Sequence, residues 1–121
     1  MMLIGELARR TGTTERLLRY YERVGLLTAQ RRDNGYREYD PGAVERVRQI
    51  RELLTVGLPT REIRRIIDCA HPDGTLDACP GVLDTLRARL TELDARAAEL
   101  TAARAALRQA ITTTESRLGP A

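Results

Sequence analysis

The last third of this chain carries a heptad repeat, which constrains the fold more than any other feature. Mostly apolar residues recur at alternating spacings of three and four from position 83 to position 118. Glycine is absent from this stretch, and Pro80 lies just ahead of it. The pattern predicts one helix over 80–118, roughly 55–60 Å long. One register of the seam holds Leu83, Leu90, Ala97, Arg104, Ile111 and Leu118, and the other holds Leu86, Leu93, Leu100, Leu107 and Thr114.

The rest of the chain is too small to cover a narrow apolar stripe along so long a helix. The leucine seam is therefore expected to pack against a second helix. The sequence therefore predicts a homodimer. An intramolecular hairpin is the alternative, but the helix has no central break. Arg104 interrupts the seam, and we expect it to set the register or the antiparallel alignment at a cost in stability. The expected dimerisation residues are Leu83, Leu86, Leu90, Leu93, Leu100, Leu107 and Ile111.

The charge of the chain is unevenly distributed. Residues 1–65 carry 14 Arg against 9 acids, whereas residues 66–121 carry 6 Arg against 8 acids. All four tyrosines fall within positions 20–39, interleaved with arginines. Tyrosine hydroxyls and guanidinium groups are common phosphate donors, so the front half is expected to meet a polyanion. The alternative is a chance distribution, since a net charge of +5 is not extreme.

Composition argues against an enzyme and against a membrane protein. The single histidine, His71, leaves no Ser-His-Asp set, and neither a glycine-rich phosphate loop nor a pair of catalytic carboxylates is evident. The start of the chain reaches Glu6 almost at once, and no apolar run approaches membrane length. We therefore expect a cytoplasmic protein with no membrane partner. A structural disulfide is disfavoured in that reducing compartment.

The first 24 residues predict two short helices joined by a tight turn. Helices are expected over about 3–10 and 15–24, with Gly12 ending the first and Thr14 capping the second. Arg16, Tyr20 and Arg23 recur at i, i+4 and i+7 on the outer face of the second helix, with Arg19 beside them. This is a helix-turn-helix pattern.

The next segment predicts a β-hairpin and two more helices. Asp33-Asn34-Gly35 is a strong turn signal between an extended stretch that reaches Arg32 and a short strand at Tyr36–Tyr39. Asp40-Pro41 is expected to cap and open a third helix, which Gly57-Leu58-Pro59 breaks. Thr60 is expected to cap a fourth helix that ends at Cys69. The fold class is thus mainly α: a winged helix-turn-helix domain at 1–69, a connecting loop at 70–79, a coiled-coil helix at 80–118 and a tail at 119–121.

Several short motifs now occur together in order and spacing. They are Ile4-Gly5-Glu6-Leu7-Ala8, Leu18-Arg19-Tyr20-Tyr21-Glu22, Gly25-Leu26-Leu27, Asn34-Gly35-Tyr36-Arg37-x-Tyr39, and Gly57-Leu58-Pro59 with Glu62-Ile63. Over residues 3–68 the chain resembles the N-terminal domain of the MerR family of bacterial transcription regulators. Few residues follow the coiled coil, so we expect a short form with no large effector-binding domain.

The resemblance implies a winged helix-turn-helix followed by a second helical pair and an antiparallel dimerisation coiled coil. It implies a homodimer on a pseudo-palindromic operator in double-stranded promoter DNA, which is bent and untwisted so that RNA polymerase can read it. We expect that no cofactor is required for DNA binding. The implied DNA contacts are Arg16, Arg19 and Tyr20 in the second helix, Arg31, Tyr36 and Arg37 in the wing, and Thr60 and Arg61 in the second helical pair.

The two cysteines leave three possibilities open. Cys79 precedes Pro80 at the expected helix N-cap, where the helix dipole favours thiolate, so it is expected to be the more reactive. Cys69 and Cys79 are then candidates for a thiol-redox response or for a metal ion. The C-x9-C spacing lacks the short interval of a strong metal motif, and no cysteine follows position 79, unlike in the metal-sensing branch of the family. Metal binding is not favoured, and the remaining possibility is that both are structural.

A second function class competes with transcriptional regulation. The coiled coil could itself be the working surface of an interaction module, with the front domain as an architectural DNA clamp that has no effector response. A preferred operator sequence would separate the two, because an interaction module would show none.

Overall fold

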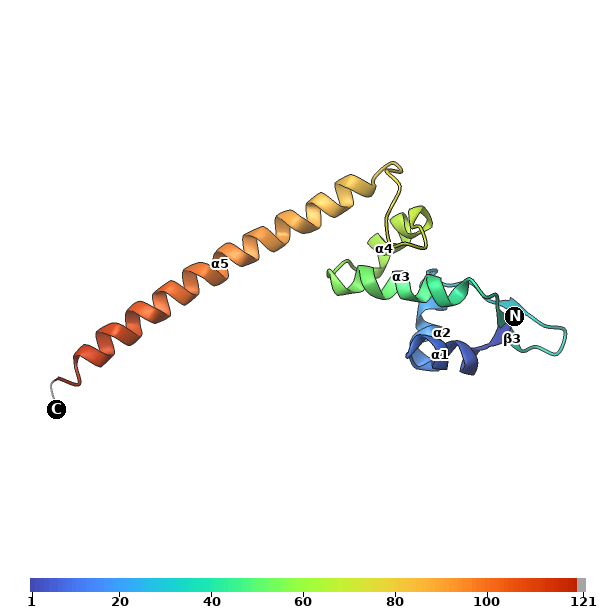
Figure 1. Ribbon diagram of the computed structural model, residues 1–121, viewed down its shortest axis with the longest axis horizontal. Coiled ribbons are helices and arrows are strands. Elements are labelled where there is room, and N and C mark those ends of the chain that lie inside the picture. Colours follow the sequence, from blue (N-terminus) through green and yellow to red (C-terminus); the bar gives the residue numbers. More distant parts are fainter. Residues whose placement is uncertain (120–121) are drawn as a thin grey trace. The chain divides into compact units, whose positions relative to one another are not determined.

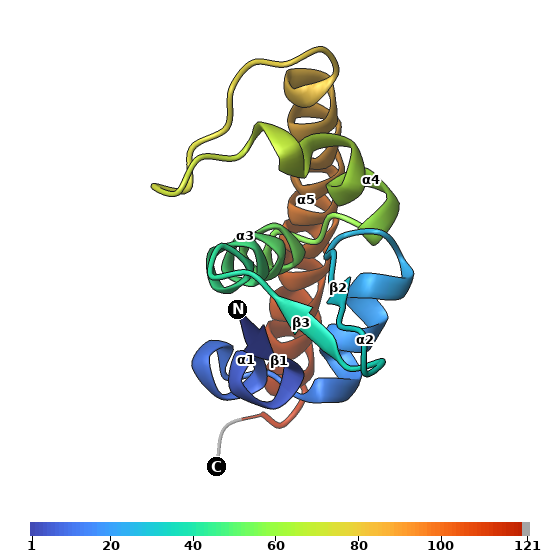
Figure 2. The same cartoon turned by 90° about the vertical axis from the view of Figure 1, so that its right-hand side faces the viewer.

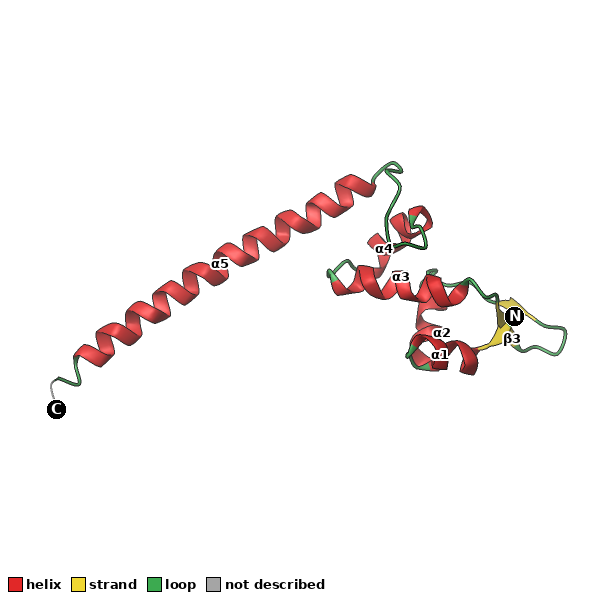
Figure 3. Ribbon diagram, in the orientation of Figure 1, coloured by secondary structure: helices red, strands yellow, loops and turns green. Residues whose placement is uncertain are grey.

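The computed structural model describes residues 1–119 and is mainly helical (Figures 1 and 3). The chain divides into two compact units, Met1–Thr85 and the segment that begins at Leu86. None of the described helices is long and apolar enough to cross a membrane. The elements in order are β1 (Met2–Leu3), α1 (Ile4–Thr11), α2 (Glu15–Arg23), β2 (Gln30–Arg31), β3 (Arg37–Tyr39), α3 (Ala43–Thr55), α4 (Thr60–Ile66), the 3-10 helix η1 (Ile67–Cys69) and α5 (Val82–Ser116).

The helix-turn-helix forms from the predicted local signals. Gly12 ends α1 in the left-handed region at φ +67°, and its N–H donates to the Ala8 carbonyl. Thr14 precedes α2, and its hydroxyl accepts a hydrogen bond of 3.1 Å from the Leu17 N–H. Both cap predictions are confirmed. The first helix begins at Ile4 rather than at residue 3, because Leu3 belongs to a strand.

A three-stranded antiparallel sheet lies beside these helices, with β3 between β1 and β2 (Figure 2). The β2–β3 pair is the predicted hairpin, and Gly35 closes its turn by donating from its N–H to the Arg32 carbonyl at 2.9 Å. The pairing of β1 with β3, in which Met2 lies opposite Tyr39, was not predicted. A strand of two residues is too short to show an alternating pattern.

The first unit has one apolar core, to which its helices and β3 contribute. Tyr21 and Tyr39 are the largest fully buried side chains, at 1% and 0% exposed. Phe and Trp are absent from the sequence, so aliphatic residues fill the remaining space. The buried aliphatic residues include Leu7, Leu18, Leu26, Val47, Ile50, Ile63, Ile66, Ile67 and Val82.

Two predicted helix starts were wrong. The third helix begins at Ala43, and the Asp40 carboxylate accepts from the Gly42 N–H at 2.7 Å, so Asp40 shapes the turn ahead of the helix. The fourth helix includes Thr60 as its first residue and has no side-chain cap. Pro59 has an extended backbone, and its carbonyl accepts a hydrogen bond from the Ile63 N–H at 3.0 Å instead.

The long helix α5 is unbroken for 35 residues, about 52 Å (Figure 1). It begins at Val82, two residues later than predicted. Most of its seam leucines are exposed in the single chain, such as Leu100 at 63% and Leu107 at 64%. Ser116 ends the helix, so Leu118 lies beyond it. Of the predicted tail at 119–121, residues 120 and 121 lie outside the described residues.

Candidate nucleic-acid interface

The outer face of α2 presents the predicted arginines to solvent. Leu18 and Tyr21 hold the opposite face in the core, so Arg16, Arg19 and Arg23 are exposed. The Arg23 guanidinium lies 5.5 Å from the centre of the Tyr20 ring. A shallow hollow of about 400 Å³ opens along this face. Its lining residues are Thr14, Arg16, Leu17, Tyr20 and Arg23.

The wing carries a second set of exposed candidates. Arg31 is exposed on β2, and the Tyr36 side chain is 65% exposed at the start of the returning strand. The Asn34 side chain accepts from the Tyr36 N–H at 3.1 Å, which orders the turn before it. Arg32 forms an ion pair with Glu38 across the hairpin. Arg31 and Tyr36 thus stand on an ordered hairpin rather than on an unstructured loop.

Arg37, the third wing candidate, is tied to α2 through Glu22. Its guanidinium lies 2.8 Å from the Glu22 carboxylate, and the Tyr39 hydroxyl donates to the same carboxylate at 3.1 Å. Burial, together with the Glu22 charge and this hydrogen bond, raises the pKa of Tyr39 to about 12. The sequence did not single out Glu22, because α2 and β3 are separated along the chain and their contact forms only in the folded unit.

A groove of about 960 Å³ lies between α2, the wing and the first residues of the chain. Arg19 lines it from α2, and Tyr36 and Arg37 line it from the wing, so the structure brings together three predicted site residues. Arg9 and Arg32 also line this groove and were missed by the sequence analysis. The only sequence feature that pointed to these two residues was the excess of arginine in residues 1–65, and it did not single out any one position.

The remaining two candidates lie in the first turn of α4. Thr60 is half-buried and Arg61 is exposed, and neither lines the groove. The α4 helix nevertheless approaches the end of α2, because a Cβ at Gly25 would lie 3.1 Å from the Arg64 Cδ. Gly25 also has φ +82°, so the absence of a side chain there serves both the turn and this close approach.

Family comparisons agree with this architecture. The model of the MerR HTH family regulatory proteins matches residues 2–69, more than half of the chain. The chain belongs to the MerR family. A second model, described as MerR, DNA binding, matches residues 44–110. The matched families are regulators rather than enzymes, which agrees with the sequence analysis.

Two individual relatives match about half of this chain. The nodulation protein NolA of Bradyrhizobium sp. (strain NC92) is 52% identical over 66 residues, which cover 54% of this chain and 28% of NolA. The regulator HmrR of Rhizobium leguminosarum bv. viciae is 35% identical over 66 residues, which cover 54% of this chain and 51% of HmrR. The chain therefore spans about a quarter to a half of the length of these relatives.

A solved MerR-type structure extends the match over most of the chain. The transcription regulator PbrR691 from Ralstonia metallidurans CH34, crystallised in complex with lead(II), superposes with a TM-score of 0.72 at 28% identity. The alignment covers 90% of this chain and 84% of PbrR691. The predicted fold, a winged helix-turn-helix followed by a long helix, is confirmed.

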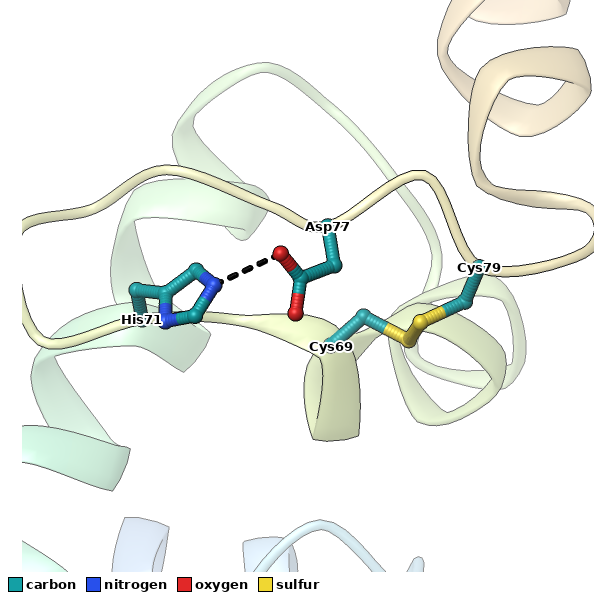
Figure 4. The surroundings of a disulfide bond; sticks show 4 residues. All are labelled: Cys69, His71, Asp77 and Cys79. Atoms are coloured by element: carbon teal, nitrogen blue, oxygen red, sulfur yellow. Dashed lines mark hydrogen bonds and ion pairs between the residues drawn. A yellow bond between two sulfur atoms is a disulfide. The ribbon is translucent and has the colours of Figure 1, made fainter.

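A disulfide bond joins Cys69, the last residue of η1, to Cys79 in the loop before α5 of this MerR-family chain (Figure 4). The expectation that disfavoured a structural disulfide was wrong. An antiparallel bridge joins Ala70 to Leu76, and the Asp77 N–H donates to the Cys69 carbonyl at 2.8 Å. The chain therefore folds back on itself, which brings the two Cα atoms to 6.4 Å.

Cys79 is not the expected N-cap thiolate. The helix starts at Val82, whose N–H donates to the Cys79 carbonyl at 3.0 Å, and the sulfur of Cys79 is bonded to Cys69. Two residues, Pro80 and Gly81, separate Cys79 from the helix, so the argument from the helix dipole does not apply. The prediction that Cys79 caps the long helix was wrong, and the relative reactivity of the two thiols stays a prediction.

Polar contacts hold the loop in place. His71 lies 2.7 Å from the Asp77 carboxylate, and this hydrogen bond and charge raise the pKa of His71 above its ordinary value (Figure 4). The Gln49 side chain, only 8% exposed, donates to the His71 carbonyl at 3.0 Å. Arg48 donates to the Pro72 carbonyl at 2.8 Å. The loop is thereby attached to α3. Across residues 1–119, no three His, Cys, Asp or Glu side chains form a group suited to a metal ion.

Proposed function

We propose that this chain is a homodimeric, sequence-specific transcription regulator of the MerR type, which binds a pseudo-palindromic operator in double-stranded promoter DNA. The observation that carries the proposal is the groove that joins Arg19 of α2 to Tyr36 and Arg37 of the wing. A helix with an exposed basic face suits the major groove, and a wing suits the adjacent phosphates. The membership of the MerR family supports the same function.

Each candidate contact has a role in this proposal. Arg16, Arg19 and Tyr20 of α2 read or approach base edges in the major groove. Arg31, Tyr36 and Arg37 of the wing bind backbone phosphates, as do Thr60 and Arg61 of α4. Arg37 also positions the wing through its ion pair with Glu22, so its role is partly that of a brace.

The dimer and its effect on the promoter complete the proposal. The exposed seam of α5 supports pairing with a second copy, because so many exposed leucines on one helix are unfavourable in water. Two DNA-binding units held in one dimer would bend and untwist the operator, so that RNA polymerase can engage both promoter elements. An architectural DNA clamp without operator preference remains the competing function.

The test compares single arginine variants on operator and on random DNA at fixed salt. Arg19→Ala is expected to weaken operator binding by about 1–3 kcal/mol, the range for loss of a good base contact. Arg37→Ala is expected to weaken binding to both DNAs and to lower the salt dependence, since it removes a phosphate contact. Arg10→Ala is the control, because this arginine is exposed and does not itself line the groove. Unchanged affinity in both test variants, by gel shift, contradicts the proposed interface.

We propose in addition that the dimer responds to thiol redox chemistry at Cys69 and Cys79. The observation that favours this is the disulfide in the loop that precedes α5. Two thiols form this bond by thiol–disulfide exchange, passing two electrons and two protons to a small disulfide oxidant, and a dithiol reverses the reaction. A metal response through the same residues finds no support in the donor groups of the described chain.

Transcription from the operator promoter tests the redox response. The purified protein is equilibrated with oxidised or reduced dithiothreitol, and transcript levels are expected to differ between the two. Cys69→Ser and Cys79→Ser are each expected to abolish the difference while operator binding persists. A difference that survives in both variants would show that the two cysteines do not sense the redox state.

A further inference from the structure

The flanks of the α5 seam carry a charge pattern that the dimer proposal leaves unexplained. If Leu83 occupies heptad position a and Leu86 position d, position e follows each d residue. Within residues 1–119, none of these e residues forms an ion pair along its own helix, and all are exposed. The e residues, in order, are Arg87, Asp94, Thr101, Arg108 and Glu115.

We propose that α5 binds a second copy of itself in one antiparallel register, with the twofold axis at Thr101. In an antiparallel coiled coil, the e positions of the two helices face each other. An axis at Thr101 places Arg87 opposite the partner's Glu115 and Asp94 opposite the partner's Arg108. Symmetry doubles each pair, so four opposite-charge contacts form. This inference rests on the homodimer proposed above and adds its register.

A shift of one heptad in either direction keeps the seam in place but destroys the charge match. In one direction, Arg87 meets the partner's Arg108. In the other, Asp94 meets the partner's Glu115. Like charges at facing positions are unfavourable. The g positions carry no acid (Val82, Arg89, Arg96, Ala103 and Ala110 within α5), so contacts between them add no attraction that could favour a shifted register.

The core of the seam disfavours the parallel alternative. In a parallel, in-register pair each a residue packs against its own copy, so Arg104 would meet the partner's Arg104. Two guanidinium groups would then share one seam layer with no acid between them, which is costly. In the antiparallel pair the two Arg104 side chains lie at different heights along the seam and have apolar neighbours.

Spin-label distances test the register directly. A label on Ala88→Cys or Gln109→Cys sits on the outward face, and the native cysteines are held in their disulfide. With 1.5 Å per residue, an axis at Thr101 predicts axial separations between copies of about 39 Å for position 88 and about 24 Å for position 109. A one-heptad shift changes both by about 10 Å in opposite directions, and a parallel pair gives about 20 Å or less at both positions.

Charge reversal tests whether the e residues select this register. Asp94→Arg would face the partner's Arg108 and is expected to raise the dimer dissociation constant about tenfold, since two attractive pairs become repulsive. Asp94→Arg combined with Arg108→Glu restores opposite charges and is expected to return the constant toward that of the wild type. Glu99→Arg is the matched control, because it makes the same change of charge at an outward heptad position.

The outcomes separate the register from the dimer itself. The expected distances together with rescue by the double variant support the proposal. A stable dimer with shifted or parallel distances overturns the register but leaves the homodimer intact, as does equal weakening by Asp94→Arg and Glu99→Arg. A monomeric wild-type protein in sedimentation equilibrium overturns the homodimer and the register together.

Discussion

At the scale of single residues, one carboxylate connects the two parts of the candidate interface. Glu22 lies on α2, accepts from the buried Tyr39 hydroxyl and pairs with Arg37 of the wing. A hydrogen bond from a buried hydroxyl to a charged group is stronger than one between neutral groups. Glu22 therefore joins the wing to α2, although it is not itself a candidate DNA contact.

Tyr39→Phe is expected to lower the free energy of unfolding at pH 7 by about 1 kcal/mol, the usual net value of a lost hydrogen bond. The pH dependence follows from the raised pKa. The wild type keeps this contribution below pH 10, the ordinary tyrosine pKa, and loses it as the pH rises towards about 12. Urea unfolding at pH 8 and pH 11 measures this effect. Between the two pH values, the free energy of unfolding should fall less in the variant than in the wild type.

A residual decline is expected in the Tyr39→Phe variant, because burial also raises the pKa of Tyr21. Tyr36→Phe is the matched control, since its exposed side chain should leave both the stability at pH 7 and the decline unchanged. If Tyr39→Phe and the wild type lose stability equally between the two pH values, the hydroxyl of Tyr39 is not the group that titrates.

At the scale of elements, short helices depend on their ends. The helix α2 has only nine residues, too few to be stable alone, so its N-cap and its packing on the core both matter. Gly12 and Thr14 act together within a single turn. Their signals are local in sequence, which is why this element was predicted to within one residue.

Thr14→Ala is expected to destabilise the protein by about 1 kcal/mol, because the Leu17 N–H loses its acceptor at the start of α2. Thr14→Ser keeps the hydroxyl and should remain close to the wild type. Chemical denaturation followed by circular dichroism measures both. A Thr14→Ser variant as unstable as Thr14→Ala would indicate that the threonine methyl group, rather than the cap, is responsible.

At the scale of the whole molecule, charge and apolar surface are divided between the two units. The excess of arginine lies in residues 1–65, whereas the exposed leucines lie along α5. One unit thus carries the candidate interface with DNA and the other carries the proposed interface with a second copy. The proposed binding of a homodimer to a pseudo-palindromic operator needs both units.

Leu93→Asp is expected to give a monomer or unfolded protein, because it places an unpaired carboxylate in the middle of the proposed dimer seam. Light scattering and a thermal melt measure the result. Thr91→Asp introduces the same charge two residues away, on the outward face of the helix, and should leave the dimer intact. A Leu93→Asp dimer with the melting behaviour of the wild type would contradict the assigned seam.

The sequence by itself determined the features whose signals are local or periodic. The heptad predicted α5, and the glycine, threonine and Asp33-Asn34-Gly35 signals predicted the helix-turn-helix and the wing. A helix period or a turn depends on residues within a few positions of one another, so a single sequence is enough. Even there, helix starts near Asp40, Thr60 and Pro80 shifted by one to two residues, because neighbouring backbone groups supplied the caps.

Only the tertiary structure decided the features that join distant segments. The pairing of β1 with β3, the ion pair of Arg37 with Glu22 and the groove lined by Arg9 and Arg19 all require contacts across the folded unit. The disulfide is the clearest case, since residues ten positions apart meet only because the loop closes through its own hydrogen bonds. The expected cytoplasmic compartment argued against that bond, but folding brings the two thiols together, and proximity controls whether a disulfide can form.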